Sequence, residues 1–402
     1  MTLRPAQFLS GQYSFLPIDT ILFGLNAIDN LAAEMDRLSI KAPLIITGNT
    51  ISTKTQIVDT VIKKLPNQNC RLFTKISERA PLTTVLEASK ISIEMEADCI
   101  LGIGGSTISD ASRVITVLNA YGIDTEVKFR KWFKERMSLD LLDTKGTSIL
   151  KQIFIPTTLS AGELNYASGT FDPSAKRKLR FSHRKLAPVL IVYDPKLSID
   201  TPPSLWLSSG IKALDHAIER LYSPKCHPIS ETSCIRAIEL LKEFLPKTAG
   251  SNHSLEDRSQ CFLGAWLSMS GYPNGGLGLS HAIGHVLGVK HWIPHGYTSC
   301  VTQPGVMEFN LPYSMSQQAS IAIALGCKKQ NKSEEALATE GHSSLRQLVH
   351  DLLLPQSLGE IGIKSQDLKS IACDTLEDTG AQDNIRPVTN SDQVIQVLKN
   401  IF

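Results

Sequence analysis

Residues 97 to 115 read ADCILGIGGSTISDASRVI, which predicts a buried strand, a glycine-rich turn and a helix. Glycines let a backbone approach a phosphate closely, and the free N–H groups of a helix N-terminus attract an anion. The turn lacks the G-x-G-x-x-G fingerprint, so a tight connection that binds nothing is an equal alternative for the turn alone. Its place after the third strand of an alternating pattern favours a cofactor site. The candidate cofactor-binding residues here are Gly104, Gly105, Ser106, Thr107 and Asp110.

The segments around this stretch extend the alternation of strand and helix. Between Ala42 and Pro156 four short apolar runs are separated by helix-length segments; the runs are PLIITG, CRLFTKI, DCILGIGG and QIFIP. Such alternation predicts a parallel sheet with helices on its faces. After residue 195 helical periodicity dominates. We therefore expect an α/β nucleotide-binding domain over residues 1–200 and an all-α domain over residues 201–402, with the active site in the cleft between them.

Composition narrows the class of partner and the compartment. The 402 residues suffice for two domains, and 41 basic against 39 acidic side chains give no field that would attract nucleic acid or an anionic membrane. We expect a small-molecule substrate, with a homodimer left open. The eight cysteines form no C-x-x-C pair, no leader follows Met1, and no apolar run is long enough to span a bilayer. These features predict a cytoplasmic protein with reduced thiols.

Histidines recur in three motifs of the C-terminal half. The motifs are GIKALDHAIE at 210–219, GLSHAIGHVLG at 278–288 and IPHG at 293–296. His281 and His285 are four residues apart, so a helix places them on one face, and a Pro-His-Gly turn can return His295 to the same place. Lys212, four residues before His216, adds an ammonium to that helix face. A lone histidine is usually structural, but this grouping predicts a reactive site whose candidate catalytic residues are Lys212, His216 and His285.

Two strand ends supply further candidates for ligand contact. The turn PTTLSAGE (156–163) is rich in hydroxyls that can bond a nicotinamide or a ribose, although by itself it is equally a capping turn. The end of the first predicted strand reads ITGNT and adds Gly48 and Asn49 to the candidates for cofactor contact. The candidates from the hydroxyl-rich turn are Thr157, Thr158 and Ser160.

Residues 120–148 form a charged, amphipathic excursion between the glycine turn and the QIFIP strand. For this segment a solvated surface helix is favoured over a lid.

The motifs together resemble one known family. GGST with Asp110, PTT with Glu163, VYDP, GIKALDHAIE, HAIGH and IPHG occur in the order and approximate spacing of the group III, iron-containing alcohol dehydrogenase family. The short PTTLSAGE loop, RSQCFLGAW and NIRPVTNSD resemble its maleylacetate reductase branch. The resemblance covers nearly the whole chain. It implies a two-domain, dehydroquinate synthase-like fold, NAD(P)H in the cleft, and hydride transfer.

The resemblance also implies roles for individual cofactor-site residues. Gly104 to Thr107 fall on the family's pyrophosphate loop, with Ser106 where a third glycine is usual, and the PTTLS turn falls beside the nicotinamide. Gly48 stands where members that prefer NAD often carry an aspartate. That carboxylate would bind the ribose hydroxyls and repel a 2′-phosphate, so its absence makes NADPH admissible.

The metal motif of the family is matched at three places and broken at one. His216, His281 and His295 correspond to its histidine ligands for Fe²⁺ or Zn²⁺, and His285 to the histidine near the reacting carbon, whereas Lys212 replaces the aspartate ligand. Lys212 is then a charged electrophile in place of the metal, a neutral amine beside a bound ion, or a side chain turned away from a three-histidine metal site. The reductase branch also lacks the aspartate, which favours weak metal binding or none.

The sequence thus predicts an NAD(P)H-dependent oxidoreductase that delivers hydride to a keto or unsaturated carbonyl compound, in the manner of maleylacetate reductase. One alternative keeps the metal and is an alcohol or aldehyde dehydrogenase. A second alternative is a redox-neutral dehydratase, isomerase or cyclase that uses Lys212 as acid, base or Schiff-base nucleophile. A binding protein without catalysis is least favoured, because the imidazoles of the site remain.

Overall fold

A computed structural model describes residues 12–66, 69–136, 149–175, 177–250 and 254–402. Its N-terminal part is built on a six-stranded sheet in which each strand pairs in parallel with its neighbours, in the order β1-β8-β5-β4-β2-β3. The predicted parallel sheet is therefore confirmed. The strands are β1 (Thr20–Phe23), β2 (Pro43–Ile46), β3 (Arg71–Phe73), β4 (Cys99–Gly104), β5 (Lys151–Pro156) and β8 (Leu190–Tyr193).

The sheet is sandwiched between helices, as buried parallel strands require. Every residue of β4 is buried, and the aliphatic side chains of β2, β4 and β5 pack into two clusters on opposite faces. The helices of this part are α1 (Leu31–Arg37), α2 (Asn49–Lys54), α3 (Ile57–Ile62), α4 (Leu82–Glu94), α5 (Ser106–Ala120) and α6 (Glu126–Arg136), with the short 3₁₀ turns η1 (Ala27–Asn30), η2 (Arg184–Leu186) and η3 (Pro195–Ser198).

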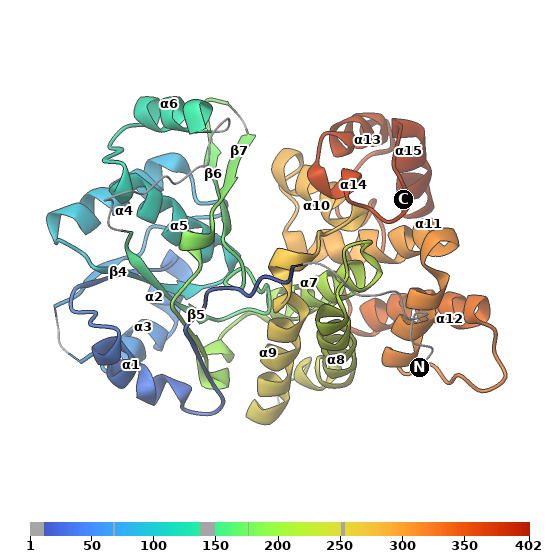
Figure 1. Ribbon diagram of the computed structural model, residues 1–402, viewed down its shortest axis with the longest axis horizontal. Coiled ribbons are helices and arrows are strands. Elements are labelled where there is room, and N and C mark those ends of the chain that lie inside the picture. Colours follow the sequence, from blue (N-terminus) through green and yellow to red (C-terminus); the bar gives the residue numbers. More distant parts are fainter. Residues whose placement is uncertain (1–11, 67–68, 137–148, 176, 251–253) are drawn as a thin grey trace.

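A two-stranded antiparallel hairpin departs from the parallel sheet. Its strands, β6 (Ala167–Asp172) and β7 (Arg177–Ser182), rise between the α/β part and the helical part in Figure 1. Strand–helix alternation gave no indication of this hairpin, because its strands are polar and follow the hydroxyl-rich turn directly. Residues from it reach the cleft described below.

The predicted excursion at 120–148 is in part a helix. In α6, Phe129 and Trp132 are buried against the α/β core, whereas Lys128, Lys131 and Lys134 are exposed. The described portion is thus an amphipathic surface helix. Residues 137–148 lie outside the described residues.

The regular structure described after residue 200 is helical, which confirms the predicted α/β-plus-helical architecture (Figure 1). Most of α7 is buried at the centre of this part, packed against α8, α9 and α11. The predicted boundary near Asp200 falls between η3 and α7 and stays a prediction. The helices are α7 (Pro203–Tyr222), α8 (Pro228–Phe244), α9 (Leu255–Met269), α10 (Leu279–Lys290), α11 (His295–Ala324), α12 (Glu334–Asp351), α13 (Leu368–Leu376), α14 (Thr379–Gln382) and α15 (Ser391–Asn400), with the 3₁₀ turns η4 (Pro246–Thr248), η5 (Tyr272–Asn274) and η6 (Ser365–Asp367).

One local expectation differs from the structure. The IPHG segment is not a simple turn: Pro294 is the N-cap residue of α11, and His295 begins that helix. Proline at this position fits because the residue before a helix needs extended backbone.

No described helix is long and apolar enough to cross a membrane, and the eight cysteines are free thiols.

Candidate active site

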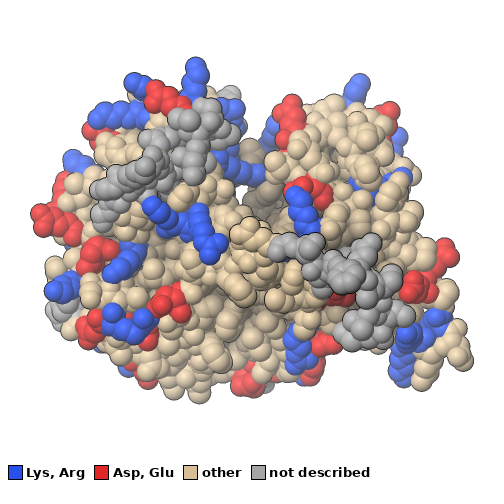
Figure 2. Space-filling view, in the orientation of Figure 1, with Lys and Arg blue, Asp and Glu red and all other residues tan. Residues whose placement is uncertain are grey.

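A cleft of about 1870 Å³ lies between the α/β part and the helical part. Figure 2 shows the notch between the two parts, with basic and acidic side chains interspersed over the face in view. The cleft is lined by nearly all of the residues predicted from the sequence; these are Gly48, Asn49, Gly105, Ser106, Thr107, Asp110, Thr157, Thr158, Ser160, Lys212, His216, His281, His285 and His295. Gly104 is the remaining candidate, and it ends β4 immediately before the glycine turn.

The glycine turn joins β4 to the N-terminus of α5. Gly104 has a φ of +146°, and a Cβ there would lie 2.7 Å from Ile108 Cγ1, so the turn requires glycine. Gly105 is the N-cap residue and has no side chain to occupy the first N–H groups of α5. A helix of 15 residues therefore presents unoccupied donors and its positive dipole end to the cleft. This cradle fits the pyrophosphate of a dinucleotide.

The hydroxyl-rich turn follows β5, the strand next to β4, so both turns lie at one edge of the sheet. Thr157 N donates to Gly104 O at 3.2 Å, and Thr158 Oγ1 donates to Ser160 Oγ at 3.1 Å. The helical part fixes the same turn, because Leu159 N donates to Ser209 Oγ at 3.0 Å. Hydroxyls on a turn held from two sides are well placed to orient a ligand.

A buried arginine holds the loop beyond this turn. Arg113 of α5 is fully buried and donates to the carbonyl oxygens of Glu163, Asn165, Ala167 and Leu186. The Glu163 carboxylate in turn accepts a hydrogen bond from Tyr193 at 2.6 Å. These bonds make Arg113 and Glu163 structural supports of the loop, in keeping with their burial away from the cleft.

The predicted histidines come together in the helical part. The rings of His216 and His281 stack with centroids 4.8 Å apart, and those of His281 and His285 are 6.1 Å apart. His295 lies 6.0 Å from His285. Burial lowers the pKa of His281 to about 3 and lowers the pKa of His216 and of His295 well below the usual value. The buried imidazoles of His216 and His281 are therefore neutral near pH 7.

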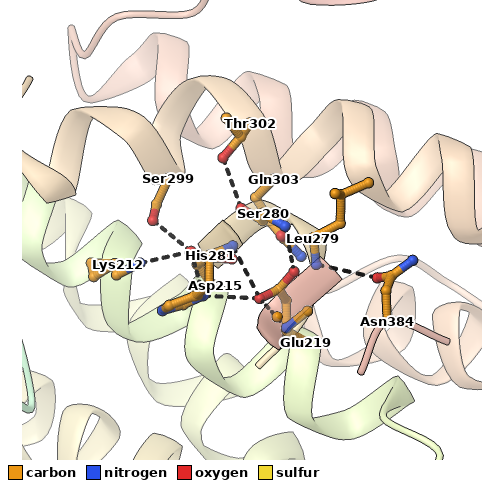
Figure 3. Close-up of polar contacts among 12 residues, drawn as sticks. Lys212, Asp215, Glu219, Leu279, Ser280, His281, Ser299, Thr302, Gln303 and Asn384 are labelled. Carbon is orange, nitrogen blue, oxygen red and sulfur yellow. Dashed lines mark hydrogen bonds and ion pairs between the residues drawn. The ribbon is translucent and has the colours of Figure 1, made fainter. Parts of the chain in front are cut away.

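Lys212 lines the cleft beside these imidazoles and is joined to a carboxylate of its own helix (Figure 3). Its Nζ lies 3.4 Å from Asp215 Oδ2, which also accepts a hydrogen bond from Ser299 Oγ at 2.5 Å. Burial lowers the Lys212 pKa, whereas Asp215 and Glu219 oppose that shift. The two carboxylates thus favour an ammonium in a site that would otherwise favour a neutral amine.

Glu219 fixes the second histidine. Its oxygens accept backbone N–H groups of Gly278 and Ser280 at 2.8 and 2.7 Å, and one oxygen accepts from His281 Nδ1 at 2.9 Å (Figure 3). Burial raises the Glu219 pKa to about 7. Sequence reasoning missed Asp215 and Glu219 as members of the site, although their spacing of three and seven residues from Lys212 places them on its helix face.

The donor atoms allow a test of whether a divalent ion fits. His281 Nε2 and His216 Nδ1 are buried without a hydrogen-bond partner among the described residues, as open ligand atoms would be. Among those residues, the one group whose ligand atoms lie within 4.8 Å of one another is Asp215, Glu219 and His281. Asp215 Oδ2 and both Glu219 oxygens already accept hydrogen bonds, whereas Asp215 Oδ1 is buried without a partner among the described residues, and Lys212 Nζ lies 3.4 Å from Asp215 Oδ2. A charged Lys212 would oppose a dication at this group by direct repulsion, whereas a neutral Lys212 would leave Asp215, Glu219 and His281 able to hold one.

Two further charged residues enter the cleft from the β6–β7 hairpin. Lys178 Nζ lies 2.5 Å from Asp110 Oδ2, so the predicted cofactor-site carboxylate is paired. Arg180 Nη1 lies 3.2 Å from Asp378 Oδ2, at the start of α14. His285 Nδ1 is 2.9 Å from the same Asp378 oxygen. Sequence reasoning missed Lys178, Arg180 and Asp378, because none of them is in a motif or near one in the chain.

Comparison with known families decides the class of this site. The model described as "Iron-containing alcohol dehydrogenase" matches residues 19–195, and the model described as "Fe-containing alcohol dehydrogenase family, C-terminal" matches residues 206–402. The chain belongs to the iron-containing alcohol dehydrogenase family. The two models meet near the transition from the sheet to α7, and together they cover both walls of the cleft.

Relatives in this family include both types of enzyme expected from the motifs. The chain is 26% identical over 394 residues to the NAD-dependent methanol dehydrogenase of Bacillus methanolicus, covering 96% of this chain and 98% of that one. It is 25% identical over 382 residues to maleylacetate reductase 1 of Cupriavidus pinatubonensis, covering 95% and 94%. A solved structure of 1,3-propanediol oxidoreductase shares the fold, with a TM-score of 0.90 at 23% identity over 98% of this chain and all of that one. The chain is thus an oxidoreductase of a family that is NAD(P)-dependent.

Proposed function

We propose that this protein is an NAD(P)H-dependent reductase that transfers hydride to a keto or unsaturated carbonyl substrate, in the manner of maleylacetate reductase. The observation that carries the proposal is the position of Lys212, whose ammonium lines the cleft among neutral imidazoles and is supported by Asp215. The dinucleotide is proposed to contact the glycine turn at Gly105 and the hydroxyls of Thr158 and Ser160. When bound, NAD(P)H supplies the hydride.

In this proposal Lys212 does the work that a metal does elsewhere in the family. Its ammonium polarises the substrate oxygen and gives it a proton as hydride reaches the carbon, and water then reprotonates the amine. His216, His281 and His295 shape the pocket as neutral rings, with His281 fixed by Glu219. The alternative, in which these three histidines hold Fe²⁺ or Zn²⁺ and the enzyme is an alcohol or aldehyde dehydrogenase, requires Lys212 to be neutral or turned away from the ion.

One experiment separates the proposal from its alternatives. The metal content of purified protein is measured by elemental analysis, and nicotinamide fluorescence is recorded as NADPH or NADH is added. We expect cofactor binding and carbonyl reduction in protein that holds far less than one equivalent of metal. Stoichiometric metal with activity lost on chelation would establish the metal-dependent alternative. Binding of neither cofactor would favour the redox-neutral alternative, in which the buried Lys212 amine acts on a carbonyl compound directly.

We further propose that NADPH is accepted at least as well as NADH. Gly48, at the N-terminus of α2, provides no carboxylate where the adenosine ribose is expected, and two cations, Lys75 and Arg79, line the neighbouring part of the cleft. Gly48→Asp is expected to shift preference toward NADH, because the new carboxylate repels a 2′-phosphate and accepts ribose hydroxyls. The measurement is the ratio of the two dissociation constants by fluorescence titration.

The matched control for this substitution is Gly48→Ala. A Cβ at residue 48 would lie 3.3 Å from Ile76 O, so some of the effect of any side chain is steric. Gly48→Ala carries that steric effect without the charge and is expected to weaken both cofactors equally. Strong NADH selectivity in the unmutated protein, or an equal shift in both variants, would contradict the proposal.

For partners and compartment we propose a small-molecule substrate, a cytoplasmic location and a homodimer. The cleft of about 1870 Å³ has room for a dinucleotide and a compact substrate, which supports the first of these. Eight free thiols support a reducing compartment. Size-exclusion chromatography with light scattering tests the dimer, and the mass of a single 402-residue chain would contradict it.

A further inference from the structure

His285 has two partners that compete for one nitrogen. Its Nδ1 lies 2.9 Å from Asp378 Oδ2 and 3.0 Å from Arg180 Nη1. The three residues come from different places: His285 from α10, Asp378 from the start of α14, and Arg180 from β7 across the cleft. A neutral imidazole has a single N–H, so the partner that engages Nδ1 decides which nitrogen carries the proton.

The geometry favours Asp378 over Arg180. If Nδ1 carries the proton, it donates to the carboxylate at 2.9 Å. If Nδ1 instead accepted from Arg180, its lone pair would face a carboxylate oxygen at that same distance, which is repulsive. Arg180 does not need the imidazole, because it donates to Asp378 at 3.2 Å and its side chain is 38% exposed to water.

The Asp378 carboxylate is itself held in place. Its Oδ1 accepts the N–H of Gly380 at 3.0 Å as the N-cap of α14, which leaves Oδ2 for His285 and Arg180. The helix start is packed closely against the beginning of α10, since a Cβ at Gly380 would lie 2.7 Å from Gly278 O. The side chain of Asp378 is 12% exposed. A carboxylate fixed at both oxygens is suited to orienting a ring.

We propose that Asp378 is a positioning residue that holds His285 as the Nδ1–H tautomer and so leaves Nε2 as a hydrogen-bond acceptor toward the substrate. This inference rests on the proposed function for the role of His285, which lines the cleft with its side chain 31% exposed. This tautomer gives His285 and Lys212 different roles. A neutral His285 with an unprotonated Nε2 accepts a hydrogen bond from a substrate hydroxyl, and Lys212 donates the proton.

The test uses substitutions that separate the cap from the histidine contact. Asp378→Ser keeps an N-cap side chain for α14 but is too short to reach His285, and Asp378→Asn keeps the size but removes the charge. Full-length protein labelled with ¹⁵N-histidine is studied by long-range ¹H–¹⁵N NMR, with the His285 signals assigned by their loss in His285→Gln. We expect the Nδ1–H tautomer in the unmutated protein and its loss in Asp378→Ser.

Kinetics provide the second readout. With a carbonyl substrate and NADPH, Asp378→Ser is expected to lower kcat about 10²-fold while KM and the cofactor dissociation constant change by less than about threefold. In a His285→Ala background the same substitution is expected to change kcat by less than about twofold, because the residue acts through the imidazole. A purely structural role would instead lower the unfolding temperature and change kcat equally in both backgrounds.

Two control variants sharpen the result. Arg180→Met removes the competing donor and is expected to leave the His285 tautomer unchanged, whereas a tautomer set by Arg180 would switch. Asp374→Ser removes a neighbouring carboxylate of α13 that pairs with Lys290, and it is expected to leave both NMR and kinetics unchanged.

The outcomes for this inference and for the proposed function are distinct. An Nε2–H signal for His285 in the unmutated protein, or an unchanged tautomer in both Asp378 variants, overturns the positioning role whatever the activity. If the unmutated protein reduces no carbonyl compound with either cofactor, the proposed function fails, and the NMR comparison still decides whether Asp378 sets the tautomer.

Discussion

Lys212→Ala is expected to lower the rate of carbonyl reduction by about 10²- to 10³-fold, the range seen when one oxyanion-stabilising donor is lost. Lys212 lines the cleft together with the imidazoles, and the carboxylates of Asp215 and Glu219 oppose the lowering of its pKa by burial. The loss should appear mainly in kcat, since the interaction strengthens as negative charge develops on the substrate oxygen. Steady-state kinetics with NADPH measure it.

Chemical rescue distinguishes loss of the ammonium from damage to the fold. Removing Lys212 leaves the buried Asp215 without its cation, which costs stability, so thermal unfolding is recorded in parallel. We expect ethylamine in the buffer to restore part of kcat in Lys212→Ala. Lys225→Ala is the matched control: Lys225 also lines the cleft, but it is 61% exposed and pairs with Asp383, so its loss should change kcat little.

Metal dependence is tested by chelation of the unmutated protein and by metal titration of a further Lys212 variant. Activity of the unmutated protein is expected to survive exhaustive chelation. Lys212→Asp should bind zinc or ferrous ion far more tightly than the unmutated protein, because a repelling cation becomes an anionic ligand beside His216 and His281. Calorimetric titration with each metal measures this change. Stoichiometric metal that is lost together with activity from the unmutated protein would mean that Lys212 is neutral or turned aside and that the three histidines are ligands.

Gly105→Val is expected to abolish cofactor binding. Gly105 is the N-cap of α5, and side-chain atoms there would fill the cradle in which the pyrophosphate is expected. The new side chain would also crowd Thr158, because a Cβ at residue 105 would lie 3.0 Å from Thr158 Oγ1. Thr158 belongs to the hydroxyl-rich turn, so the substitution disturbs both proposed cofactor contacts at once. Fluorescence titration with NADPH measures the loss.

A graded series keeps this prediction falsifiable. Gly105→Ala adds the Cβ alone and is expected to weaken NADPH binding less than Gly105→Val does, while thermal unfolding of the apoprotein changes little. Gly359→Ala is the control, since its Cβ would meet only ordinary contacts of 3.7 and 3.8 Å in a region remote from the cleft. Unchanged NADPH affinity in Gly105→Val would show that the glycine turn is not the pyrophosphate site.

Several features of the fold were predictable because they are local. Buried parallel strands need continuous apolar runs, and β4 and β5 lie at the predicted runs DCILGIGG and QIFIP. The glycine turn was predictable for the same reason, since only glycine readily adopts the φ of Gly104. By contrast, the β6–β7 hairpin has polar strands, and its place depends on the cleft that it borders, so no periodicity marked it.

The sequence by itself determined one part of the site: Lys212 and His216 on α7, and His281 and His285 on α10, because helical periodicity places residues four apart on one face. The tertiary structure decided what state those groups are in. Asp215 lies 3.4 Å from Lys212 Nζ, Glu219 fixes His281 from another helix, and Asp378, at 93 residues from His285 in the chain, fixes that ring. Charge state and tautomer depend on burial and on partners that are distant in sequence, and folding alone brings those together.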